Sequence, residues 1–392
     1  MRVLGLSTDT RWGASVLVLG SWLQALAAEG DVVALACVSG SALARGARAE
    51  WPRLSLREVQ AEGWWRRTHS VREVVQALRP DAMLVYRGDD AAAAALAMGP
   101  RGPVVWRQPM SRHGTGAAPV RSQPERVGWR QRTALARGLV RRMEPGLHSV
   151  FWPPPAVLDD ETAPGVLRLA DAAARTDTAR SDGSLMVPPR VTLLLPPYLN
   201  DEGIHALRVL AALHQRHASL RVRLVADGEE RGVAPLLQDA RVHAAALGMA
   251  AALSVQSLDA WLAEGSRAGA SRVEASRSED VLWVVDAGDA GTLAVVEAMH
   301  RAIPVVASAA RHYADLVLPG VTGLHLPQAK SAPSALDDGA QLLSDLARVL
   351  GDAEWRSTMG AAGQRHLHRV RAPRAILHGL RVMLDPTSSP LA

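Results

Sequence analysis

The chain has 392 residues, of which 48% are hydrophobic and 21% are charged, with a formal net charge of +5. This composition is that of a folded globular protein and excludes an extensively disordered chain, and the length suits two or three domains, of which we expect two. We expect neither a membrane span nor a signal peptide, because no apolar run approaches roughly 20 residues and the first run is short.

Short apolar runs and helical patterns alternate along the first part of the chain. Strands are predicted at residues 3–6, 32–38, 82–86 and 104–106, and helices at residues 16–26, 71–78 and 91–98. Strands that alternate with helices form a parallel sheet covered by helices on both faces. We therefore predict that residues 1–152 form an α/β domain.

The same alternation returns after a region rich in proline and small polar residues. Residues 153–189 begin with consecutive prolines and are predicted to be an interdomain linker. Beyond them, strands are predicted at residues 191–195, 221–226, 281–285 and 303–307, and helices at residues 202–216 and 355–370. Residues 190–370 are thus predicted to form a second α/β domain, and residues 371–392 a C-terminal helix and tail.

The strand predicted at residues 281–285 is followed by a turn of small residues. Asp286, Gly288, Asp289 and Gly291 form this turn, and an apolar helical pattern then continues to residue 299. The start of such a helix presents backbone N–H groups at the carboxyl end of the strand, where an anionic group such as a diphosphate can bind. Glu297 is predicted about one turn into the helix, within reach of the bound group.

This stretch resembles the donor-binding half of the retaining, nucleotide-sugar-dependent glycosyltransferases of family 4. Their hallmark is two Glu separated by seven residues, followed by Ala-Met, a Pro-Val-Val-Ala strand and a Thr-Gly-Leu turn. The matching residues are Asp289, Glu297, Ala298, Met299, Pro304, Val305, Val306, Ala307, Thr322, Gly323 and Leu324. The spacing is intact, but the first Glu is Asp in this chain. The resemblance extends over nearly the whole length and is clearest over residues 281–365.

The resemblance implies the GT-B fold, an α/β architecture of two facing Rossmann-like domains with parallel sheets and a C-terminal helix that returns to the first domain. It also implies retaining transfer of a sugar from a nucleotide sugar to a glycan or lipid-linked acceptor, with no metal or other cofactor. Residues 1–152 would hold the acceptor and residues 190–370 the nucleotide.

The resemblance assigns roles to individual residues. Asp289 takes the position that contacts the transferred sugar, Glu297 the position that binds the ribose hydroxyls, and His113 lies near the family's His beside the donor. The remaining donor-binding candidates are Gly13, Gly291, Thr292, Leu293 and Arg311. For two of these residues a purely structural role is the alternative to ligand binding. Asp289 also suits the N-cap of a helix, and Glu297 suits a position near a helix N-terminus, where the helix dipole stabilises its negative charge.

One departure from the family pattern concerns the diphosphate. Family members carry an Arg and a Lys in the turn after the first strand of the second domain, and here these places hold Pro197 and Glu202. Preorganised cations that stabilise charge on a leaving group contribute on the order of 3 kcal/mol each. Either another cation serves, with Arg311, Arg107 and Arg112 as candidates, or the protein is a catalytically degenerate glycosyltransferase-like protein that binds a nucleotide sugar or a partner without turnover.

Several remaining features bear on partners and location. Nucleic acid is not expected, because no binding motif accompanies the arginines that make up all but one of the 44 basic residues. A basic helix predicted at residues 125–142 suits either an anionic membrane or a solvated surface. The pair Asp89 and Asp90 is interpreted as helix N-capping rather than a metal site. The lone Cys37 suits a cytoplasmic location, with peripheral contact at the inner face of the membrane as a further possibility.

Overall fold

The computed structural model divides the chain into two compact units. One comprises Met1–Pro155 with Pro373–Ala392, and the other Ala156–Ala372. The residues that the structure describes are 1–60, 62–85, 88–99, 104–107, 147–150, 189–196, 198–227, 230–267, 280–285, 288–308, 313, 316–326, 343–344, 346–370, 381 and 384. Most of the linker predicted at residues 153–189 lies outside them.

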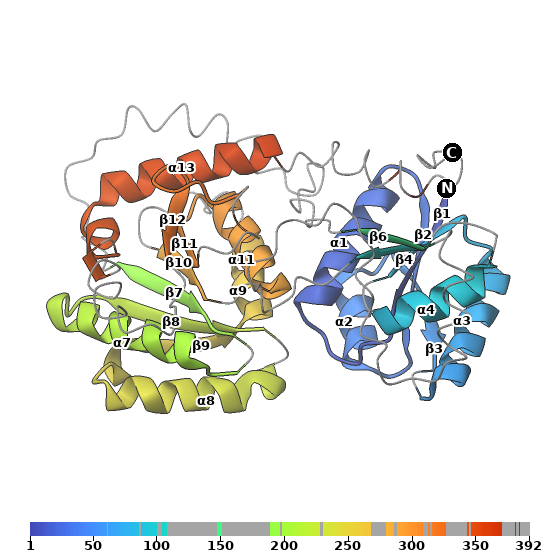
Figure 1. The fold of residues 1–392 in the computed structure, drawn as a ribbon, viewed down its shortest axis with the longest axis horizontal. Coiled ribbons are helices and arrows are strands. Elements are labelled where there is room, and N and C mark those ends of the chain that lie inside the picture. Colours follow the sequence, from blue (N-terminus) through green and yellow to red (C-terminus); the bar gives the residue numbers. More distant parts are fainter. Residues whose placement is uncertain are drawn as a thin grey trace. The chain divides into compact units, whose positions relative to one another are not determined.

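The first unit is built on a six-stranded parallel sheet with the strand order β3-β2-β1-β4-β5-β6 (Figure 1). Its strands are β1 (Arg2–Ser7), β2 (Val32–Val38), β3 (Ser55–Val59), β4 (Ala82–Val85), β5 (Val104–Arg107) and β6 (Leu147–Val150). Its helices are α1 (Ala14–Ala28), α2 (Ala42–Glu50), α3 (Trp64–Leu78) and α4 (Gly88–Met98). The strand order reverses between β1 and β4, as in a doubly wound sheet.

The second unit repeats this plan with the strand order β12-β11-β10-β7-β8-β9, again parallel. Its strands are β7 (Arg190–Leu194), β8 (Arg221–Ala226), β9 (Leu253–Ser257), β10 (Asp280–Val284), β11 (Val305–Ser308) and β12 (Gly323–Leu326). Its helices are α7 (Asp201–Arg216), α8 (Glu230–Ala246), the short 3-10 helix η3 (Ala250–Ala252), α9 (Leu258–Arg267), α11 (Asp289–His300) and α13 (Ala353–Val370). The order reverses between β7 and β10.

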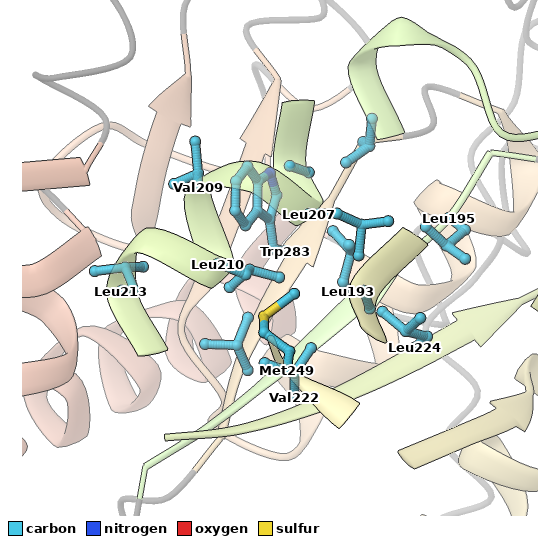
Figure 2. Close-up of a cluster of buried hydrophobic side chains, with 14 of the residues drawn as sticks. Leu193, Leu195, Leu207, Val209, Leu210, Leu213, Val222, Leu224, Met249 and Trp283 are labelled. Atoms are coloured by element: carbon cyan, nitrogen blue, oxygen red, sulfur yellow. The ribbon is translucent and has the colours of Figure 1, made fainter. Parts of the chain in front are cut away.

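The core of the second unit forms where α7 and α8 cover one face of the sheet. Trp283 of β10 lies among apolar side chains of α7, including Leu207 and Leu210, as Figure 2 shows. These residues recur at helical spacing in α7, while alternate residues of each strand face the same layer. Helices α9 and α11 cover the opposite face of the sheet. Almost every residue of α11 with a described side chain is buried.

The C-terminal segment belongs to the first unit, as predicted. Leu384 is fully buried in the cluster that includes Val3 and Leu26. Arg381 donates to Asp31 Oδ2 at 3.0 Å and to the Glu29 carbonyl at 3.3 Å. The chain therefore completes the second sheet before its last residues return to the first unit.

Candidate functional site

The point where the strand order of the second sheet reverses is the natural place for a ligand. β7 leads into α7 and β10 leads into α11, and these two connections run to opposite sides of the sheet. In open α/β sheets, ligands bind outside the carboxyl ends of the strands at such a reversal. The starts of α7 and α11 therefore define the candidate site.

The start of α11 follows β10 as predicted, but fewer amides are available than expected. The N-cap is Gly288, which makes no side-chain cap, and Asp289 is the first helical residue. Thr292 donates its amide to the Gly288 carbonyl at 3.1 Å, and Leu293 lies deeper still in the helix. Donation by the amides of Thr292 and Leu293, predicted from the sequence, is therefore corrected, since both belong to the helix. Beyond the N-cap, the amides of Asp289, Ala290 and Gly291 are those to which the helix itself offers no acceptor.

The start of α11 is also closely packed. Gly288, Ala290, Gly291 and Thr292 are all buried, Thr292 with 2% of its surface exposed. These residues expose little surface, and contact of their amides with a ligand stays a prediction. The side chain of Asp289 lies outside the described side chains, and Arg311, His113, Arg112 and Pro197 lie outside the described residues. Their predicted roles stay predictions.

Glu297 lies farther along α11 than the sequence suggested. It is the ninth residue of the helix, more than two turns and about 12 Å from Asp289 along the axis. Its Oε1 accepts a hydrogen bond of 2.6 Å from Nε of Arg301, one turn nearer the helix C-terminus. The prediction that Glu297 sits one turn from the loop is wrong, because the helix begins earlier than its apolar pattern indicates.

Arg301 is the residue of this site that the sequence interpretation missed. Its Nη2 donates to the carbonyl oxygens of Trp261 and Leu262, both at 2.9 Å, and its guanidinium lies 4.5 Å from the centroid of a Trp261 ring. The Glu297 and Arg301 side chains are 18% and 9% exposed. The separation of four residues between an acid and an Arg was the available signal, because such residues are neighbours on a helix.

The start of α7 is acidic and already capped. Asn200 Oδ1 accepts the Gly203 amide at 2.9 Å, and Asp201 and Glu202 occupy the first turn with exposed side chains. Negative charges at a helix N-terminus stabilise the helix and oppose the approach of an anion. The departure from the family pattern at Glu202 is therefore built into the local structure.

The corresponding edge of the first sheet holds a buried carboxylate. Asp90, fully buried in α4, accepts from the Thr8 amide at 2.9 Å and from the Thr8 hydroxyl at 2.5 Å, and Arg67 Nη1 lies 3.7 Å from its Oδ1. Because α4 begins at Gly88, N-capping by Asp90 is wrong, and the carboxylate joins the end of β1 to α4 instead. Asp89 is the second residue of this helix.

Gly13 lies at the N-cap of α1, in the turn after β1. Its φ of 175° is extended backbone that any residue adopts. Its carbonyl accepts the amides of Val16 and Leu17 at 3.0 and 3.1 Å. The structure thus places Gly13 at the edge where it was predicted, without a backbone conformation that requires glycine.

The described residues offer neither a metal site nor a membrane span. Within that part of the chain, no group of three or more His, Cys, Asp or Glu side chains is arranged to hold a metal ion. No helix in the described ranges is long and apolar enough to cross a membrane. The expectation that no metal is needed stays a prediction.

These two doubly wound sheets and the returning C-terminal segment define the GT-B class of α/β proteins, and solved structures agree. HepE of Anabaena in complex with UDP and glucose is 14% identical, with a TM-score of 0.60 over 98% of this chain and 99% of that one. A glycosyltransferase from Rickettsia africae is 10% identical, with a TM-score of 0.60 over 99% of both chains. Sucrose-phosphate synthase of Thermosynechococcus elongatus is 13% identical, with a TM-score of 0.57 over 97% of both.

No family model and no curated protein matches the chain. The likeness to solved structures therefore establishes the GT-B fold, as the sequence predicted. A fold by itself does not name a reaction, and the function has to be argued from the site.

Proposed function

We propose that this protein is a retaining glycosyltransferase of the family 4 type, which moves a sugar from a nucleotide sugar to a glycan or lipid-linked acceptor. The observation that carries the proposal is the β10–α11 unit, in which helix α11 starts beside the reversal point of the second GT-B sheet. HepE, which shares the fold over almost its whole length, is bound to UDP and glucose, and this likeness supports a nucleotide-sugar donor.

The proposed chemistry assigns limited tasks to the protein. The bond between the anomeric carbon and the diphosphate breaks, the acceptor oxygen bonds to the same face of that carbon, and the acceptor proton passes to an oxygen of the leaving diphosphate. No protein nucleophile is needed. The Ala290 and Gly291 amides stabilise the growing negative charge together with the helix dipole. Glu297 accepts hydrogen bonds that the ribose hydroxyls donate, and Asp289 contacts the transferred sugar.

A second function is favoured by the start of α7. Exposed Glu202 lies where the resembled family has a Lys. The Gly203 amide already donates a hydrogen bond to Asn200 Oδ1 and is not free for a phosphate. A developing diphosphate charge next to Glu202 is destabilised, so chemistry would be slowed more than ground-state binding. The alternative is a GT-B protein that binds a nucleotide sugar without transferring it.

Titration calorimetry followed by a turnover assay separates the two functions. The protein is titrated with UDP, ADP and GDP and with their sugar conjugates, and release of nucleoside diphosphate is then measured with glycan and lipid-linked acceptors supplied. Binding with acceptor-dependent release supports the transferase, whose retention is checked from the anomeric configuration of the product by NMR. Binding without release supports the second function, and no binding by any of these compounds contradicts both.

The cytoplasmic location and contact with an anionic membrane are part of this proposal as predictions. The basic segment at residues 125–142 that motivates membrane contact lies outside the described residues. Flotation of the protein with vesicles of zwitterionic lipid and with vesicles containing anionic lipid tests that contact directly.

A further inference from the structure

The guanidinium of Arg301 is fixed on several sides at once. Its Nε donates to Glu297 at 2.6 Å, its Nη2 donates to the carbonyls of Trp261 and Leu262, and its face lies against the Trp261 ring. Trp261 is itself 2% exposed. Because α9 supplies these carbonyls and the ring, the position of Arg301 is set by a neighbouring helix (Figure 1). A side chain held at so many points has little rotational freedom left to lose.

Among the residues that the structure describes, only one oxygen of Glu297 has a hydrogen-bond donor. Oε1 is taken by Arg301, and no described residue donates to Oε2. The carboxylate is mostly but not fully buried, with 18% of the side chain exposed. Hydrogen bonds to a charged carboxylate are stronger than neutral ones, and a carboxylate that is already oriented makes them without further ordering.

Arg301 is badly placed to replace the cations missing beside the diphosphate. It is the C-cap residue of α11, twelve positions after Asp289, which corresponds to about 18 Å along the helix. Its effect on a ligand at this sheet edge must therefore pass through Glu297.

We propose that Arg301 is a positioning residue, which holds Glu297 so that Oε2 accepts a ribose hydroxyl of the donor nucleotide. This inference rests on the proposed function, because it takes the ligand to be a ribonucleoside diphosphate or its sugar conjugate. The contrasting role is structural, in which Arg301 only ties α11 to α9.

Discrimination between ribose and 2′-deoxyribose separates these roles. Calorimetry on the full chain measures the dissociation constants of UDP, ADP and GDP and of their 2′-deoxy counterparts. For the nucleotide that binds, we expect the wild type to favour the ribose form by about tenfold, as loss of one hydrogen bond to a charged group implies. In Glu297→Gln and Arg301→Gln the ratio is expected to fall toward one. Arg301→Lys keeps the charge without the planar fork, so its ratio is expected to lie between.

The control is Arg223→Gln. Arg223 pairs with Glu264 at 2.8 Å in the same unit, with side chains 14% and 48% exposed. Removing that pair tests a general loss of stability, and the ribose preference should be kept. A ribose preference that stays at the wild-type level in a folded Arg301→Gln protein, or its absence in the wild type, overturns the inference and leaves the proposed function standing. If no nucleotide binds, both fall together.

Discussion

Asp90 is a residue whose importance depends on distant parts of the chain. Its buried carboxylate accepts both the amide and the hydroxyl of Thr8, 82 positions away. Replacement by Ala leaves two buried donors without this acceptor, so we expect Asp90→Ala to lower the free energy of unfolding by about 2–4 kcal/mol. Urea denaturation measures this loss. The control is Asp81→Ala, whose carboxylate accepts the Arg2 amide at 2.7 Å but is 42% exposed, and which should cost less than half as much.

Glu202 provides a charge test of the proposed site. Its side chain is exposed in the first turn of α7, so Glu202→Lys is expected to fold normally. Exchanging a negative for a positive charge near a bound diphosphate should tighten nucleoside diphosphate binding roughly three- to tenfold at low salt, and the gain should shrink as salt is raised. Calorimetry at two ionic strengths measures it. Glu354→Lys changes an exposed acid in the first turn of α13 and controls for net charge. An equal gain in both variants contradicts the placement of the diphosphate.

Cys37 gives a prediction that depends on pH. Burial is the main cause that raises the pKa of its thiol from 9.0 to about 11, with smaller effects of Arg48 and Glu58. Because the unfolded chain releases this proton first, the contribution of Cys37 to stability is complete below pH 9 and is lost as pH rises toward 11. Iodoacetamide at pH 8.5 should modify the folded protein at least about tenfold more slowly than the urea-unfolded one. Similar rates would contradict the burial.

Individual side chains show where reasoning from the sequence stops. Glu297 and Arg301 are four residues apart, so the sequence contained enough information to predict their ion pair on one face of a helix, although the interpretation missed it. Asp90 resembled a helix cap because only its own neighbours were visible. Its real partner is brought to it by the parallel pairing of β1 with β4. Spacing in the sequence predicts partners within one helix, whereas partners distant in the sequence depend on how the strands pair.

At the scale of elements, buried strands were the easiest to predict. Strands β2 and β8 coincide with their predicted bounds. β2 is an unbroken apolar run, which is typical of a strand covered on both faces, and in β8 two Arg alternate with apolar residues before a buried apolar end. Helix α2 and the edge strand β3 were missed. β3 carries Arg57 and Glu58 on exposed positions, and without a buried pattern an edge strand resembles a loop.

The packing of α13 on α11 gives a prediction at this scale. A Cβ added at Gly360 would lie 1.8 Å from the Ala302 carbonyl oxygen, a backbone atom, whereas at Gly363 its nearest neighbour would be 3.5 Å away. We expect Gly360→Ala to destabilise the second unit by about 2–3 kcal/mol, because the helix must shift. Gly363→Ala on the same helix should be neutral or stabilise by up to about 1 kcal/mol through helix propensity. Urea unfolding of the two variants is compared, and equal stabilities would contradict the packing of these helices.

The whole-molecule plan was predictable because it repeats. Two rounds of alternating strands and helices indicate two doubly wound sheets, and the motif from Asp289 to Leu324 predicted the class of the second. The site itself was less predictable. Residues at the start of α11 are buried, and no spacing within the motif reports the packing of residues distant in the sequence. The family pattern thus predicted the helix start after β10, which the structure confirms, and what that helix start binds stays a prediction.

The return of the C-terminal segment to the first unit gives the prediction that belongs to the molecule as a whole. Leu384 is fully buried in the same cluster as Cys37, so Leu384→Ala should cost the first unit about 3 kcal/mol and speed the alkylation of Cys37 in mild urea. The second unit should be unaffected, because Leu384 packs within the first. Arg381→Ala removes only the partly exposed contacts with Glu29 and Asp31 and should cost about 1 kcal/mol or less. Alkylation of Cys37 that is unchanged in Leu384→Ala would show that the first unit is stable without its C-terminal contribution.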